Sequence, residues 1–316
     1  MKIALVELIP KSPIIFNSAN IMSYFFTRGN FIPSQTIRGS FLGYFRRVRP
    51  EMFEKVQDFF ASPAYPWESA PSTVFTPALG RKSNCFAEIK GWGEEQNLTN
   101  YLSKFREVST EFKDKEECVK DFQMAKPKVG QIIRKEMEGR KFTLFKKVEL
   151  EGQVEMSVAI DKHTASSEKG MLFAYEYKFP EKMWALAQPG EVLDSVDRIF
   201  IGRGKSRGFG WVDVRKKKEI DVEEEGKGKY YCLSQCVPTL FGKTYFQVDK
   251  IYGDLSYYIS WFTNDEHEGY RPSFKALKEG SIIQGERTKE NPPLLSAGLN
   301  FAIKIEDLTT LLRWQA

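Results

Sequence analysis

One stretch of the chain stands between two strand-like segments and combines four glycines with three cations: Ile201-Gly202-Arg203-Gly204-Lys205-Ser206-Arg207-Gly208-Phe209-Gly210-Trp211. Glycine adopts positive φ and lets the backbone approach a ligand, so successive N–H groups can turn toward one anion. Arg203, Lys205 and Arg207 place positive charge at the same point. The stretch therefore predicts a loop that holds phosphates, with a flexible, solvated hairpin tip as the alternative.

The residues after this loop exclude the common mononucleotide-binding motifs. A Rossmann motif or a P-loop requires that its glycines open a helix, whereas residues 211–214 continue as an alternating strand. The basic run at residues 215–218 adds charge just beyond the loop, although such a run also suits a solvated face. Loop and run together favour a polyanion as the ligand.

The bulk composition indicates a folded chain with room for two domains. It has 316 residues, of which 41% are hydrophobic and 14% aromatic, and this excludes a mainly disordered protein. The net charge of +5 is small, so nucleic-acid binding has to come from local basic patches. One patch is the loop with residues 215–218, and a second comprises four arginines on one predicted helix: Arg38, Arg46, Arg47 and Arg49.

The N-terminus and the cysteines narrow the class of protein further. Residues 1–10 are apolar over too short a span for a signal peptide or a membrane helix, so we expect a buried first strand in a soluble intracellular protein. The four cysteines, Cys85, Cys118, Cys232 and Cys236, match no zinc-ribbon spacing. Cys232 and Cys236 are expected in the core, and we predict neither a metal nor a cofactor.

A helix is predicted after the first strand. Pro33 and Ser34 suit a helix start, and apolar residues from Ile37 to Phe45 recur at helical spacing. Gly39 and Gly43 each weaken an isolated helix by about 1 kcal/mol relative to Ala. Two glycines on one face therefore suggest either close packing or a close approach to a ligand.

The order of the remaining elements predicts an α+β fold. We expect strands at residues 154–160 and 171–177, a short helix within 181–196, and a strand at 198–201 that leads into the glycine-rich loop. Strand, helix, two strands, helix, strand is the ferredoxin-like order. We predict a first domain at residues 1–218, with a partly helical insertion at about 62–148, and a smaller C-terminal α+β domain at 219–316.

Three segments taken together resemble one known family. They are residues 32–40 at the helix start, residues 159–164 followed by 170–173, and the glycine-rich loop. The set resembles the RAMP superfamily of CRISPR-associated proteins, and most of all the type III-D effector RAMP subunit that corresponds to the crRNA 5′-tag-binding subunit of Csm and Cmr complexes. The resemblance implies two ferredoxin-like domains with a glycine-rich loop and a role in antiviral defence. It also implies a cytoplasmic location, with no membrane.

The resemblance also implies which residues bind RNA and which partners the chain has. The candidate RNA-binding residues are Gly202, Arg203, Gly204, Lys205, Ser206, Arg207, Gly208, Phe209, Gly210, Ser34, Arg38, Ser40 and His163. The implied partners are the 5′ tag of crRNA, the large Cas10-type subunit and adjacent backbone RAMP subunits. Some members carry a Cys-rich element in the insertion, and residues 124–128 show none, so no zinc is expected.

Aromatic side chains are candidates for stacking on unpaired bases. They are Phe209, Trp211, Tyr24, Phe25, Phe26 and Tyr44. We expect Phe209 to be the best platform, because it lies inside the loop itself.

Two enzymatic functions compete with pure RNA binding. A repeat-processing endoribonuclease would use His163 as a general acid or base, and a target-cleaving backbone subunit would use an aspartate such as Asp161, Asp194 or Asp197. We expect Asp161 to cap the end of its strand, and the other two to serve turns or helix caps. A third possibility is a structural subunit whose charged segments contact a neighbour. We predict that this chain alone is not an enzyme.

Overall fold

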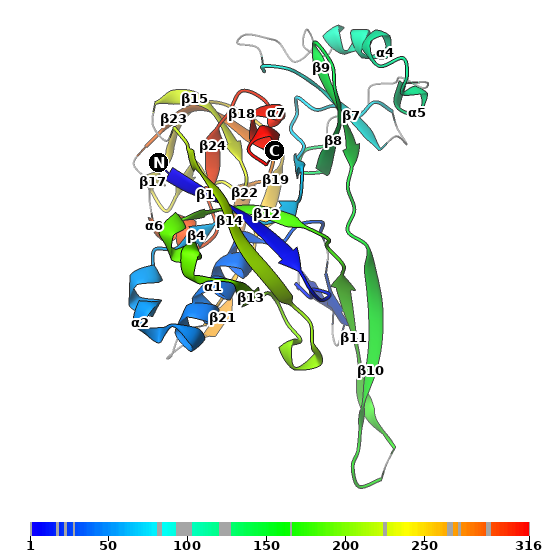
Figure 1. The fold of residues 1–316 in the computed structure, drawn as a ribbon, viewed down its shortest axis with the longest axis vertical. Helices are drawn as coiled ribbons and strands as arrows, with labels where there is room; N and C mark the ends of the chain where they lie inside the picture. Colours follow the sequence, from blue (N-terminus) through cyan, green and yellow to red (C-terminus); the bar gives the residue numbers. More distant parts are fainter. Residues whose placement is uncertain are drawn as a thin grey trace. The chain divides into compact units, whose positions relative to one another are not determined.

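The computed structural model describes residues 2–16, 19–21, 24–27, 29–80, 84–92, 103–119, 128–164, 166–223, 226–263, 268–270, 273–288 and 292–315. The chain is a mixed α/β protein, rich in strands and with few helices (Figure 1). It divides into two compact units, one made of Lys2–Trp67 with Glu149–Ile220 and the other of Glu68–Val148 with Asp221–Ala316. We call them the glycine-loop unit and the C-terminal unit.

The main sheet of the glycine-loop unit has the strand order β13-β14-β1-β12-β4, with β5 also paired to β12. The strands are β1 (Lys2–Pro10), β4 (Phe60–Ala61), β5 (Tyr65–Pro66), β12 (Met183–Gln188), β13 (Arg198–Phe200) and β14 (Trp211–Asp221). β1 and β12 run antiparallel, with Val6 opposite Ala185. The first strand and the strands on both sides of the glycine-rich loop are therefore confirmed.

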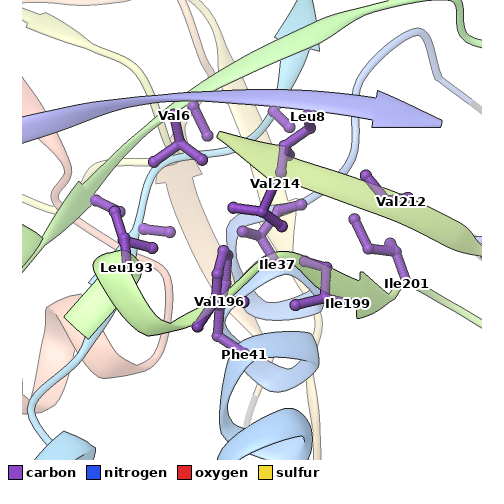
Figure 2. Packing of buried hydrophobic residues seen from close by; sticks show 14 of the residues in the cluster. Val6, Leu8, Ile37, Phe41, Leu193, Val196, Ile199, Ile201, Val212 and Val214 are labelled. Atoms are coloured by element: carbon purple, nitrogen blue, oxygen red, sulfur yellow. The ribbon is translucent and has the colours of Figure 1, made fainter. Parts of the chain in front are cut away.

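Helix α1 (Ser34–Val48) packs on this sheet and starts where the sequence predicts, with Pro33 as its N-cap. Its buried side chains Ile37, Phe41 and Phe45 share one core with Val6 and Val214. Figure 2 shows this cluster, in which side chains of α1 meet those of β1 and β14. Short α2 (Pro50–Phe53) and 3₁₀ turn η1 (Glu54–Val56) follow α1.

The helix predicted within residues 181–196 is wrong over its first half. Met183–Gln188 is strand β12, and a 3₁₀ turn, η3 (Gly190–Ser195), follows it. Five of the six residues of β12 are buried, and they lie on both faces of the strand, since Trp184 and Leu186 alternate with Met183 and Ala185. A strand buried on both faces appears in sequence as a continuous apolar run, which periodicity cannot distinguish from a buried helix.

The strands predicted at 154–160 and 171–177 exist, but in a second sheet. β10 (Gly152–Ile160) and β11 (Ser167–Lys178) form a long antiparallel hairpin, drawn in green in Figure 1. This sheet has the order β10-β11-β3-β2, with β2 at Ala19–Ile21 and β3 at Tyr24–Phe26. In the main sheet, the two strands that come between α1 and η3 along the chain are therefore β4 and β12. The predicted strands at 154–160 and 171–177 do not take this place.

The C-terminal unit holds two four-stranded sheets. One has the order β6-β8-β9-β7 and comprises Ser69–Pro71, Ile132–Glu138, Phe142–Lys147 and Cys85–Ile89; the other has the order β18-β23-β15-β24 and comprises Phe246–Tyr252, Ile282–Arg287, Lys227–Cys232 and Ala302–Lys304. Three two-stranded pairs join β16 (Thr239–Leu240) to β17 (Lys243–Thr244), β19 (Leu255–Tyr258) to β22 (Phe274–Leu277), and β20 (Trp261–Thr263) to β21 (Glu268–Tyr270). Its helical pieces are η2 (Phe105–Glu107), α4 (Val108–Glu111), α5 (Glu116–Val119), α6 (Pro292–Ser296) and α7 (Leu308–Arg313).

In the C-terminal unit, residues 88–92 of the predicted insertion make hydrogen bonds among themselves and to residues 307 and 308 at the start of α7. Glu88 of β7 accepts hydrogen bonds from Trp92 Nε1 at 2.8 Å and from the main-chain N–H of Leu308 at 3.0 Å. Asp307 caps α7 and also accepts from the N–H of Gly91. Burial raises the pKa of Glu88 well above its usual range. The predicted boundaries at 62–148 and 218/219 stay predictions.

The cysteines divide into two pairs. Cys232 and Cys236 are free and fully buried, which confirms their expected place in the core, although β15 ends at Cys232 and does not reach Cys236. Cys85 and Cys118 form a disulfide, which the spacing of the cysteines does not predict. Among the described residues, no helix is long and apolar enough to span a membrane.

Candidate nucleic-acid interface

All four glycines of the loop between β13 and β14 have left-handed backbone conformations. Their φ values are 83° at Gly202, 81° at Gly204, 86° at Gly208 and 82° at Gly210. A Cβ atom at Gly202 would lie 2.0 Å from the carbonyl oxygen of Ile15, and one at Gly210 would lie 2.3 Å from that of Ile201. The loop therefore depends on glycine for its conformation, as its sequence predicts, and at Gly202 and Gly210 a carbonyl oxygen leaves no space for a Cβ atom.

Main-chain hydrogen bonds hold the loop in place. The N–H of Arg203 donates to the carbonyl of Ile15 at 3.0 Å, and the N–H of Gly210 donates to that of Pro13 at 2.8 Å. Residues Lys205–Arg207 form a 3₁₀ turn, η4, that begins at the left-handed Gly204. Within the described part of the chain, the N–H groups of Gly204, Lys205 and Ser206 find no acceptor. Successive free N–H groups at such a turn form a concavity that suits an anion.

The loop cations lie over aromatic rings of the neighbouring strands. Lys205 Nζ is 5.6 Å from the ring centre of Trp211 and 5.7 Å from that of Phe200. Arg207 Cζ is 5.0 Å from the ring centre of Tyr175 on β11. Both side chains are exposed, so their charges are positioned by the rings yet remain open to solvent.

An open groove of about 950 Å³ runs between this loop and α1. Helix α1 contributes eight of its lining residues: Gln35, Thr36, Gly39, Ser40, Gly43, Tyr44, Arg47 and Val48. The other lining residues are Ile15, Tyr175, Arg198, Ile199, Phe200, Gly202, Arg203, Gly204, Lys205, Ser206, Arg207 and Trp211. Five of the described lining residues are cationic and none is acidic, so the groove attracts anions.

One of these cations is paired at the rim of the groove. Arg198 Nε donates to Asp213 at 2.6 Å, and this hydrogen bond holds the pKa of Asp213 below its usual range. Asp213 therefore partly neutralises the charge of Arg198 at the rim.

Gly39 and Gly43 form the α1 side of the groove. A Cβ atom at either position would meet no atom within 4 Å. The described residues do not pack against these glycines, so close packing does not explain them, and a close approach of a ligand stays a prediction. Ser40 lies between them and donates its hydroxyl to the carbonyl of Thr36 at 2.7 Å.

The structure does not bring Ser34 and Arg38 into the groove. The hydroxyl of Ser34 is buried and donates to the carbonyl of Ala61 at 2.5 Å. Arg38 donates to the carbonyls of Phe59 at 2.7 Å and Gln57 at 2.6 Å. Both residues tie α1 to the segment that follows it, and RNA contact by either one stays a prediction.

His163 also lies apart from the groove, in the turn between β10 and β11. Its side chain is exposed, and its main-chain N–H donates to the carboxylate of Asp161 at 2.8 Å. The expected capping role of Asp161 is confirmed. A role for His163 in RNA binding stays a prediction.

The aromatic candidates separate clearly. Phe209 is half-buried, with its ring 5.3 Å from that of Tyr177, and it is not a groove residue. Trp211 and Tyr44 do line the groove. Phe200 lines it too, and sequence reasoning missed this residue. The side chains of three further candidates lie outside the described part of the structure: Tyr24, Phe25 and Phe26.

Three residues of the basic run at residues 215–218 form ion pairs on β14, namely Arg215, Lys216 and Lys217. Lys216 contacts Asp194 at 3.1 Å and Glu219 at 3.0 Å. Lys217 lies 3.9 Å from the buried carboxylate of Glu7. None of residues 215–218 lines the groove, so the polyanion site suggested for loop and run together reduces to the loop.

Comparison with known proteins shows the family of this chain. Residues 11–213, which include α1 and the glycine-rich loop, match the model of the RAMP superfamily. The chain belongs to the RAMP superfamily. No curated protein matches the chain by sequence.

Solved structures of type III effector proteins are similar to this RAMP chain at low identity. A chain of the type III-B Cmr-beta complex bound to cognate target RNA is 14% identical with a TM-score of 0.47, covering 89% of this chain and 86% of its own. A chain of Cmr-beta in the apo state is 9% identical with a TM-score of 0.38, covering 68% and 97%. Oligomeric Cmr4 from Pyrococcus furiosus is 16% identical with a TM-score of 0.30, covering 70% and 99%.

Proposed function

We propose that this RAMP protein is a non-catalytic subunit of a type III CRISPR effector complex and that its groove holds the single-stranded 5′ tag of crRNA. The observation that carries the proposal is the lining of the groove, with cations, aromatic rings and free main-chain N–H groups but no described carboxylate. Single-stranded RNA offers phosphates, unstacked bases and 2′-hydroxyls to these groups.

We also propose a ferredoxin-like fold for the glycine-loop unit. Along the chain, β1, α1, β4, β12, η3 and the pair β13–β14 follow the order strand, helix, strand, strand, helix, strand. This order supports a ferredoxin-like fold for the unit. In the same unit, α1 and the glycine-rich loop line one groove. A second ferredoxin-like domain near the C-terminus is proposed on the family resemblance alone.

The chain itself is proposed not to cleave RNA. Among the described groove residues there is no histidine, aspartate or glutamate to act as a general base, and His163 and Asp161 lie in the β10–β11 turn. Incubation of the purified chain with labelled crRNA, with and without Mg²⁺, tests this point. Cleavage that disappears in His163→Ala would support a processing nuclease instead.

The partner subunits are proposed to dock on the β10–β11 hairpin. Val154, Met156, Val158 and Ile160 alternate along β10, and each is between 45% and 65% exposed. A row of exposed apolar side chains on one strand face suits a protein interface. We propose a neighbouring RAMP subunit or the large Cas10-type subunit as the occupant, and Met156→Lys should weaken co-purification with them while leaving RNA binding unchanged.

Replacement of the three loop cations tests the proposed function directly. The variant Arg203→Ala/Lys205→Ala/Arg207→Ala should bind labelled single-stranded crRNA more weakly, with a salt dependence of log K smaller by about 2, since each lost phosphate contact removes about 0.7. Its thermal unfolding should stay close to that of the wild type, because all three side chains are exposed. Equal binding by the variant would refute the assignment of the loop.

A further inference from the structure

Trp211 is the most exposed of the tryptophans whose side chains the structure describes. It is 37% exposed, whereas Trp184 is fully buried and Trp92 is 3% exposed. The exposed part of the Trp211 ring belongs to the lining of the groove, so the ring is open to a ligand that enters there.

The main chain of Trp211 is held firmly beside the loop. Its N–H donates to the hydroxyl of Ser12 at 2.9 Å, and its carbonyl accepts from the N–H of Lys11 at 2.8 Å. The ring meets Phe200 edge to face, with ring centres 6.1 Å apart and planes at 77°. The contact with Phe200 therefore holds the indole in place, and little conformational entropy remains to be lost when a ligand binds.

The space next to the ring suits an unpaired nucleotide. The groove volume of about 950 Å³ is at the upper end of the range for small-molecule pockets, about 300–1,000 Å³. Across it, Gly39 and Gly43 leave open space where other residues would place a side chain. In a duplex, both faces of each base are covered by neighbouring base pairs, so only an unpaired base can offer a face to a single ring.

A cation accompanies the ring at a useful distance. Lys205 Nζ lies 5.6 Å from the centre of the Trp211 ring, on a side chain that is otherwise exposed. A base that stacks on Trp211 brings its own 5′ and 3′ phosphates with it. Lys205 can then exchange its contact with the ring for an ion pair with a phosphate, which is a stronger interaction than the cation–π contact at an exposed site.

We propose that Trp211 stacks on one unpaired base of the bound RNA while Lys205 pairs with an adjacent phosphate. The inference rests on the proposed function and deepens it by assigning a base-binding residue. It also replaces Phe209 as the stacking residue, because the Phe209 ring is packed against Tyr177 and a Cβ at Gly204 would lie 2.8 Å from it.

The test compares two single-stranded probes of equal charge, an oligoadenylate of about ten nucleotides and an abasic ribose-phosphate oligomer of the same length. Wild-type protein should prefer the oligoadenylate by about 5- to 150-fold, the range for one stacked base. Trp211→Ala should lose this preference by weakening only the binding of oligoadenylate, and Trp211→Phe should recover most of it. The salt dependence for the abasic probe should be the same in wild type and Trp211→Ala, because the phosphate contacts remain.

Three results would overturn the inference. Trp211→Ala with an unchanged preference would show that no base stacks there, and an equal loss for both probes would show a role in loop structure instead of stacking. Failure of the wild type to bind either probe would overturn the proposed function as well, so the two failures are distinguishable. Phe241→Ala is the matched control, since this ring is 82% exposed in the C-terminal unit and its loss should change neither affinity.

Discussion

Replacement of Gly43 should raise stability whatever the size of the new side chain, and should weaken RNA binding only when that side chain is large. Glycine in a helix interior costs about 1 kcal/mol relative to alanine, and a Cβ at this position of α1 would meet no atom within 4 Å. Gly43→Ala should therefore raise the free energy of unfolding by about 1 kcal/mol without a steric penalty. Gly43→Leu should raise it by a similar amount, since leucine has nearly the helix propensity of alanine.

The binding effect should grow with the size of the new side chain. One methyl group occupies little of a groove of about 950 Å³, so Gly43→Ala should bind RNA almost as the wild type does. The leucine side chain reaches further into the groove and should displace one base or phosphate contact, which corresponds to a loss of about 1–3 kcal/mol in binding.

Urea denaturation followed by circular dichroism measures the stability of both variants, and fluorescence anisotropy with labelled crRNA measures their affinity. Gly39→Ala serves as the control for helix propensity, because it lies on the same face and should give the same gain in stability. A destabilised Gly43→Leu would mean that the space over α1 is not open. Unchanged RNA affinity in Gly43→Leu would mean that the ligand does not lie over this face.

Three further predictions concern stability. Gly208→Ala should lower the free energy of unfolding by about 1–2 kcal/mol, because alanine is strained at a left-handed φ. Gly210→Ala should lower it by about 1–3 kcal/mol more, because its Cβ would also press on a carbonyl oxygen. Equal urea midpoints for the two variants would contradict this prediction. Loss of the Cys85–Cys118 disulfide in Cys118→Ser should lower the free energy of unfolding by about 3–4 kcal/mol, given the 33-residue separation, and a reductant should then have no further effect. Burial raises the pKa of Glu279 to about 7, so the contribution of this carboxyl group to stability is present below pH 4.5 and is lost as the pH rises through 7. In Glu279→Gln, the free energy of unfolding should therefore fall by about 2–3 kcal/mol less between pH 4.5 and pH 7.5 than it does in the wild type. Urea denaturation at the two pH values measures this difference.

The elements that could be predicted are those whose apolar residues follow a clear period. β1, α1, β10, β11 and the strands around the loop were found this way. The start of α1 was predicted from Pro33 and Ser34, and the cap at Asp161 from the tendency of aspartate to bond nearby main-chain N–H groups. β12 was missed because it is buried on both faces and shows no alternation. The disulfide between Cys85 and Cys118 was missed because spacing along the chain does not tell which cysteines meet.

The candidate site was only partly visible in the sequence. The loop can be recognised from its glycines and cations. Arg198 and Phe200 both line the groove, and because they are two residues apart on β13 their side chains point to the same face of the strand. Tyr175 comes from the hairpin of the second sheet, and no local pattern connects it to Arg207. The hydrogen bonds of Ser34 and Arg38 to a segment about twenty residues away or more could not be foreseen either, since they arise from tertiary packing.

The sequence by itself determined which conformations the loop can adopt, because glycine at Gly202, Gly204, Gly208 and Gly210 permits the positive φ seen there. Only the tertiary structure decided what that loop faces. Packing of α1 on the sheet sets Gly39 and Gly43 across from Lys205 and Trp211 and turns Arg38 toward the main chain. A site made of residues far apart in the chain depends on which surfaces are buried together, and that choice belongs to the whole fold.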